Sequence, residues 1–140
     1  MKKRLLYLIL PIITLILEIL PYGAVCNFAR PATDDGTIER VRELYSYFDL
    51  LPFGYANFAP LLTAIVTCFI FLFLVIYCFT GKYSVVKITK GVLSAAVVLS
   101  LCPLLYGLDY FSVVGALITI SLIAELLLLF FTIRKTEVKA

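Results

Sequence analysis

Residues 1–28 read MKKRLLYLILPIITLILEILPYGAVCNF, and this stretch fits either a cleaved signal peptide or a first membrane helix. The basic residues 2–4 and the apolar core that follows them are common to both. A cleavage site requires small residues, whereas the branched Val25 stands directly before Cys26. At 1.5 Å per residue, residues 5–22 cover about 27 Å of a hydrocarbon layer about 30 Å thick. We therefore expect this segment to stay in the protein as its first transmembrane helix.

The composition is that of an integral membrane protein, with 63% hydrophobic and 15% charged residues among 140. The sequence contains no His, which removes the commonest general base and the usual ligand of haem, zinc and copper. Its four cysteines lack CxxC spacing. We therefore expect no enzymatic activity, no cofactor and no metal site.

Three further apolar runs follow the first, at residues 58–79, 91–108 and 110–133. The third of the four is the weakest, because it is short and carries Pro103, although residues 85–88 can extend it at its start. The sequence predicts an all-α fold of one domain, residues 1–140, with four transmembrane helices in an antiparallel bundle.

The basic residues are distributed unequally between the two ends of the predicted spans. Nine lie on the side of the two chain ends and three in the outer loop 23–57; the nine are Lys2, Lys3, Arg4, Lys82, Lys87, Lys90, Arg134, Lys135 and Lys139, and the three are Arg30, Arg40 and Arg42. Cytoplasmic loops carry the excess of Lys and Arg. The bias predicts that both termini are cytoplasmic and that residues 23–57 lie outside. The charge of +3 is thus sorted by membrane side, and we expect no nucleic-acid partner.

The outer loop is too long for a simple connection and is expected to carry structure. Within TDDGTIERVRELYSYF, residues 33–48, apolar side chains recur at helical spacing. This pattern predicts a short amphipathic helix over residues 37–48, with Ile38, Val41, Tyr45 and Phe48 on its buried side. The helix can either cover the end of its own bundle or bind a partner. Elsewhere in the outer region, Cys26 and Cys102 are placed so that a disulfide between them is possible.

Two carboxylates lie within predicted spans, and intramembrane acids are costly enough to be candidates for function. Counted from the inner boundary, Glu18 lies about 21 Å and Glu125 about 13 Å into the membrane. By the same count Thr67 lies near Glu18 and Ser100 near Glu125, so these four residues form the candidate intramembrane polar site. We expect Glu125 to be protonated and hydrogen-bonded to Ser100 or Ser121. Packing and proton coupling both remain open as roles for the two acids.

These observations point to a non-enzymatic accessory or interaction subunit of a membrane complex. Its partners would be the lipid bilayer and another membrane protein or a second copy of the chain. The small size and the lack of an N-x-S/T acceptor indicate a bacterial plasma membrane. The alternative is a small oligomeric transporter or channel that uses Glu18 and Glu125.

Overall fold

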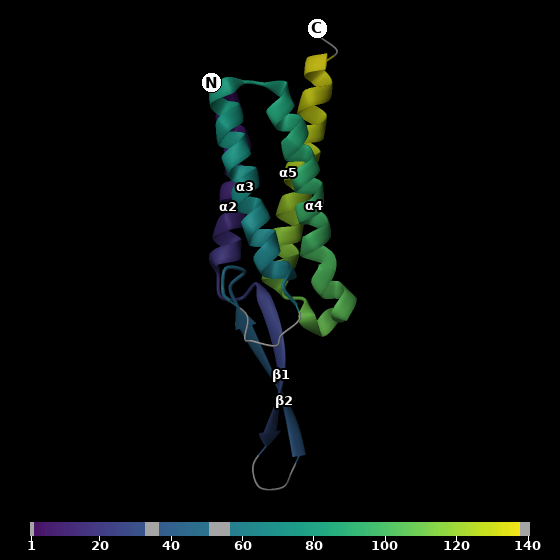
Figure 1. The fold of residues 1–140 in the computed structure, drawn as a ribbon. Coiled ribbons are helices and arrows are strands. Elements are labelled where there is room, and N and C mark those ends of the chain that lie inside the picture. The colour runs from purple at the N-terminus through teal and green to yellow at the C-terminus, as the bar shows by residue number, and fades with distance from the viewer. Residues whose placement is uncertain (1, 33–36, 51–56, 138–140) are drawn as a thin grey trace.

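The computed structural model describes residues 2–32, 37–50 and 57–137, which form a group of long helices with a β-hairpin at one end (Figure 1). In chain order the elements are α1 (Lys2–Leu5), η1 (Leu6–Leu8), α2 (Ile9–Ile19), β1 (Ala24–Ala32), β2 (Thr37–Tyr45), α3 (Ala59–Thr80), α4 (Tyr83–Leu101), η2 (Cys102–Tyr106), η3 (Leu108–Tyr110) and α5 (Val113–Glu137), where η denotes a 3-10 helix.

The four helices α2 to α5 lie side by side, each in contact with the next, and α5 closes the ring against α2. Their interior contains large apolar side chains such as Ile70, Leu93 and Leu122, which are fully buried. Many large apolar side chains remain on the outside, such as Phe79 at 76% and Phe131 at 67% exposure. Three helices, Ala59–Thr80, Tyr83–Tyr106 and Val113–Phe131, are long and apolar enough to cross a membrane. This agrees with the membrane class predicted from the composition.

The first apolar run is less regular than predicted. Its helix is interrupted by η1 and ends at Ile19, so the apolar helical stretch Leu6–Ile19 is shorter than the three long helices. Leu20 is extended, with ψ of 136°, because a residue that precedes a proline is pushed out of the helical region by the proline ring. The predicted helix to residue 22 was therefore too long by three residues at its outer end.

The other three runs are helical with shifted boundaries. α3 begins with Pro60 in its first turn and ends at Gly81, whose φ of +65° suits a glycine after a helix end. α4 begins at Tyr83, eight residues before the predicted start at 91, so the proposed extension is present. It ends where Pro103 removes a backbone donor, and the chain continues as η2 and η3 before α5 begins at Val113.

The prediction of an amphipathic helix over residues 37–48 was wrong, because residues 37–45 form strand β2. β2 pairs antiparallel with β1, with Ala24 opposite Tyr45 and Ala32 opposite Thr37. Ile38, expected on the buried side, is 73% exposed. A lone helix of this length is marginal in water, whereas the neighbouring residues 24–32 supply a full-length partner strand. The hairpin extends beyond the helices (Figure 1).

The two cysteines that were considered for a disulfide lie apart in this arrangement. Cys26 is fully buried in β1, and Cys102 begins η2 and is partly exposed. Both remain thiols in the structure, so no disulfide joins them.

The base of the hairpin lies between the helices and contacts the last turn of α2. The Ser46 hydroxyl and the Tyr47 backbone N–H both donate to the Glu18 carbonyl oxygen, each at 2.9 Å. These bonds satisfy a carbonyl that the helix end leaves without an intrahelical donor. Ser112 at the start of α5 donates to the Gly23 carbonyl, and the ring of Tyr47 packs against Gly23 and Ile118. We refer to residues 46 and 47 as the hairpin base.

Replacement of Gly23 by alanine should destabilise the protein, because the new Cβ would lie 2.8 Å from a ring carbon of the buried Tyr47. We expect a loss of about 1–3 kcal/mol of unfolding free energy. Gly91→Ala is the matched control, since its Cβ meets nothing within 4 Å, and it should raise the unfolding free energy by about 0.5–1 kcal/mol. Denaturant titration in detergent micelles measures both. Equal values for the two variants would contradict the insertion of Tyr47.

Candidate polar site inside the helix bundle

Six hydroxyl and carboxyl side chains lie inside the bundle in pairs that are four residues apart on their helices. This spacing places both members of a pair on one helix face, here the face turned inward. All six side chains are buried, and we call them the interior polar column: Thr14 and Glu18 of α2, Thr63 and Thr67 of α3, and Ser121 and Glu125 of α5.

The middle of the column joins α2 to α5 through a hydrogen bond of 2.7 Å between the Thr14 and Ser121 hydroxyls. Thr14 also lies 3.0 Å from the Leu10 carbonyl oxygen, an acceptor one turn earlier. Because each hydroxyl has one hydrogen, Thr14 donates to Leu10 and Ser121 donates to Thr14. Both hydroxyls are therefore satisfied without either carboxylate.

The outer part of the column joins α2 to α3. Thr67 donates to Oε1 of Glu18 at 2.8 Å and also lies 3.0 Å from the Thr63 carbonyl oxygen. The structure thus brings Glu18 and Thr67 together at the level that the sequence count predicted. Oε2 of Glu18 is buried and has no hydrogen-bond partner in the part of the chain that the structure describes.

Glu125 is fully buried like Glu18, but neither of its oxygens has a hydrogen-bond partner among the described residues. The predicted bonds to Ser100 and Ser121 are not formed. Ser100 donates to the Val97 carbonyl at 2.8 Å, and the Ser121 hydroxyl is hydrogen-bonded to Thr14. The predicted depth of Ser100 was wrong because it was counted from residue 91, whereas α4 begins at Tyr83. Ser100 is the penultimate residue of α4. Glu125 lies twelve residues into α5, about 18 Å from its outer end.

The two acids lie on opposite sides of the hydrogen bond between Thr14 and Ser121. Glu18 is one turn from it toward the hairpin and Glu125 one turn toward the other end, since α2 runs toward the hairpin and α5 away from it (Figure 1). Their separation along the bundle is about 12 Å at 1.5 Å per residue. The acids therefore do not share a proton directly, although hydroxyl groups lie between them.

The chemistry available to this column is proton exchange and hydrogen bonding. A buried carboxyl without a cationic partner is strongly disfavoured in its ionised form, so each acid is held most cheaply as a neutral group. Among the described residues no group of three or more His, Cys, Asp and Glu side chains is placed to hold a metal ion. Sequence reasoning missed Thr14 and Thr63, which the four-residue spacing to Glu18 and Thr67 would have indicated.

Comparison with models of protein families, with curated proteins and with solved structures gives no match for this chain. Its function must therefore be argued from its own geometry.

The structure predicts that the two acids differ in their contribution to stability. Glu18→Leu removes the acceptor of Thr67 and should cost about 0.6–1.7 kcal/mol, the range for one hydrogen bond between membrane helices. Glu125→Leu removes no hydrogen bond to the described residues and should cost less. Glu18→Gln retains an acceptor oxygen and serves as the control. Unfolding in detergent provides the measurement, and a larger loss for Glu125→Leu than for Glu18→Leu would contradict this account.

Proposed function

We propose that the chain is a four-span protein of a bacterial plasma membrane, with both termini in the cytoplasm. Three helices have the required length, and α2 completes the ring with them despite its shorter apolar stretch. The proposal places the hairpin outside the membrane. After α2 ends, the chain would cover the remaining distance to the outer surface without further helical turns, packed against the hairpin base.

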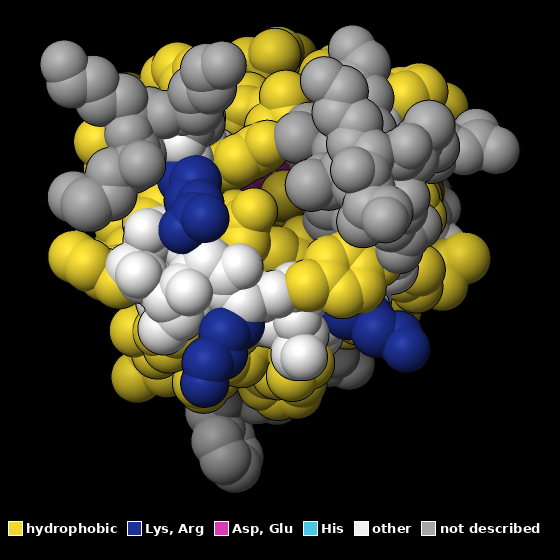
Figure 2. Space-filling model, turned by 90° about the horizontal axis from the view of Figure 1, so that it is seen from above, with side chains coloured by type: hydrophobic (Ala, Val, Ile, Leu, Met, Phe, Trp, Pro, Cys, Tyr) yellow, Lys and Arg dark blue, Asp and Glu magenta, His cyan; other side chains and the backbone are white. Residues whose placement is uncertain are grey.

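The distribution of charge supports this orientation. At the end opposite the hairpin, Arg4 packs over the ring of Tyr77 with its guanidinium carbon 5.6 Å from the centroid, next to the link between α3 and α4. Figure 2 looks down on this end and shows Lys and Arg side chains among apolar ones. The basic residues at this end include Arg4, Lys82, Lys87 and Lys90, and cytoplasmic ends carry such an excess.

Cysteine labelling tests the orientation in cells. In a variant without native cysteines, Ile38→Cys should react with a membrane-impermeant maleimide from outside, because Ile38 is 73% exposed on the hairpin. Lys82→Cys, between α3 and α4, should react only after the membrane is permeabilised. The reverse pattern would show that the protein is inserted the other way.

Within the membrane, the proposed role is that of a non-enzymatic accessory or interaction subunit whose hairpin binds another membrane protein or a second copy. The observation that carries this proposal is the position of the hairpin, which extends beyond the helices as a two-stranded sheet. Among the described residues, β2 pairs with no strand other than β1, and an edge of this kind recruits further strands. Ile38 adds an exposed apolar side chain to this surface.

A second candidate function is a small oligomeric transporter or channel that exchanges protons through Glu18 and Glu125. The observation that favours it is the set of three buried carboxyl oxygens that have no hydrogen-bond partner among residues 2–32, 37–50 and 57–137. Against it, large apolar side chains such as Ile70, Leu93 and Leu122 fill the interior. A proton pathway would therefore have to lie between copies or open by helix movement.

Site-specific photo-crosslinking in cells distinguishes the two functions. A photoreactive residue at Ile38 should give one discrete adduct with a protein, whereas the same residue at Phe79 should give none. Phe79 is the matched control, because it is 76% exposed and lies at the opposite end of the helices. Ile38→Asp should abolish co-purification of the adduct partner. No adduct at Ile38, together with a proton flux in vesicles that Glu125→Gln abolishes and Glu39→Gln preserves, would favour the transporter instead.

A further inference from the structure

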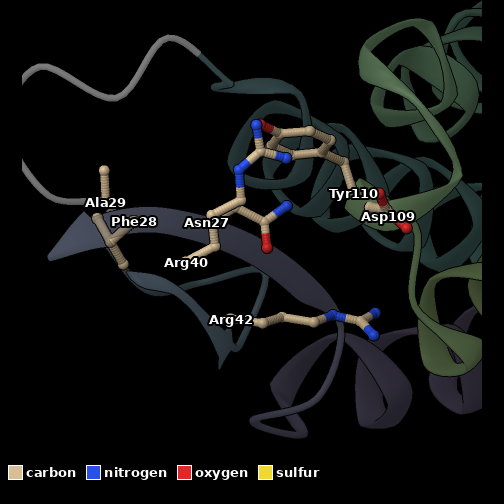
Figure 3. A pocket seen from close by; sticks show the side chains of 7 residues that line it. All are labelled: Asn27, Phe28, Ala29, Arg40, Arg42, Asp109 and Tyr110. Carbon is tan, nitrogen blue, oxygen red and sulfur yellow. The ribbon is translucent and has the colours of Figure 1, made fainter. Parts of the chain in front are cut away.

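A cavity of about 370 Å³ lies at the outer end of the bundle, between the hairpin and the turn η3 that precedes α5. Its polar lining consists of Asn27 of β1, Arg40 and Arg42 of β2, and Asp109 and Tyr110 of η3. Figure 3 shows the side chains of Asn27 and Arg40 directed toward Tyr110, whereas the side chain of Arg42, on the same strand as Arg40, extends away from that group. Residues far apart in the sequence thus converge on one space.

The cavity has a net positive charge that the protein leaves unbalanced. Arg40 and Arg42 are two residues apart in β2 and therefore lie on one face of the hairpin. Both are exposed, and in the described parts of the chain neither forms an ion pair with a carboxylate. Arg42 makes only a long contact of 3.5 Å with the Phe111 carbonyl. Two guanidinium groups and the Asp109 carboxylate leave one net positive charge at the cavity.

The opposite face of the hairpin shows how this chain balances an arginine when no ligand is involved. Arg30 forms an ion pair of 2.8 Å with Glu43, and Glu43 also accepts a hydrogen bond of 2.6 Å from the Tyr45 hydroxyl. This bond to a carboxylate raises the pKa of Tyr45. The two faces of one hairpin therefore differ, with a balanced network on one side and two unpaired guanidinium groups on the other.

A second, mainly apolar groove adjoins the cavity, and Arg42 lines both. The groove measures about 290 Å³ and runs between Tyr22, Leu44 and the first turn of α5. Val113 in this turn is 80% exposed, at the point where the apolar surface of α5 begins. The two spaces together thus present a cationic compartment followed by an apolar one that leads onto the helix surface.

We propose that this pair of compartments binds one anionic phospholipid of the leaflet on the hairpin side. Its phosphate would accept hydrogen bonds from Arg40, the Asn27 amide and the Tyr110 hydroxyl, and from Arg42 after its exposed side chain turns toward them. One acyl chain would follow the groove along Val113. A lipid with one net negative charge balances the single positive charge of the cavity, whereas Asp109 disfavours headgroups that carry several negative charges. This inference goes beyond the proposed function, since it does not depend on a protein partner.

Lipid binding by the full chain in a non-ionic detergent provides the test, with native mass spectrometry as the readout. Phosphatidylglycerol should bind with one tight site and phosphatidylcholine at least tenfold more weakly. Arg40→Gln and Arg42→Gln should each weaken the binding of phosphatidylglycerol by about tenfold, a typical loss for one charge-assisted hydrogen bond. Arg30→Gln is the matched control, because it makes the same charge change on the opposite face of the hairpin and should leave binding unchanged. Circular dichroism checks that all three variants fold.

Three outcomes would overturn the proposal. Equal binding of the two lipids would show that charge is not recognised. An equal loss in Arg30→Gln would indicate attraction by the overall charge of the hairpin rather than a site. Competition by inorganic phosphate at the same concentration as phosphatidylglycerol would assign the cavity to a free anion and leave the apolar groove without a role.

Discussion

The carbonyl oxygen of Glu18 imposes the constraint on which the rest of this structure depends. It belongs to the last turn of a helix that ends inside the bundle, where water cannot satisfy it. The hairpin base supplies both donors, the Ser46 hydroxyl and the Tyr47 N–H, and so holds the whole hairpin against the helices. Within a membrane, backbone groups outside regular helices are tolerated only when other parts of the protein satisfy them, and here the hairpin base satisfies this carbonyl.

Residue 18 also connects this junction to the interior of the bundle. Its backbone carbonyl binds the hairpin base, while its side chain accepts a hydrogen bond from Thr67 of α3. The Thr14 and Ser121 hydroxyls then extend the polar contacts to α5. The same short stretch of α2 is thus bonded to the outer hairpin and to two of the other helices. Glu125 does not take part in these bonds, and both of its carboxyl oxygens lack a hydrogen-bond partner within the described ranges.

The insertion of the hairpin base determines the chemistry of the outer surface as well. It directs one face of the hairpin toward η3, so that Arg40 and Arg42 meet Asp109 and Tyr110 around the cavity. The isolated bridge between Ala24 and Phe111 anchors β1 to the chain just before α5. The remainder of the hairpin stands clear of the helices. The cavity is the surface that we propose for a lipid headgroup, and the projecting part of the hairpin is the surface that we propose for a protein.

The sequence by itself determined the membrane class, the four apolar segments and the unequal distribution of basic residues, because these follow from composition and from charges counted along the chain. Pro21, Gly81 and Pro103 each lie just after the end of a helix, although the predicted first and third spans extended past Pro21 and Pro103. The pairing of Glu18 with Thr67 followed from counting residues, since the helical rise is constant. The four-residue spacing from Glu18 and Thr67 could also have indicated Thr14 and Thr63.

Only the tertiary structure decided the secondary structure of residues 37–48. Their apolar residues satisfy a helical period, but β2 forms because residues 24–32 lie close enough to supply a complete partner strand. The partners of Glu125 and Ser100 depended on where α4 begins, and eight extra residues at its start moved Ser100 away from the depth of Glu125. The cavity at Arg40 and Arg42 joins residues more than sixty positions apart. Such contacts arise from the packing of whole elements, and no local pattern in the chain encodes them.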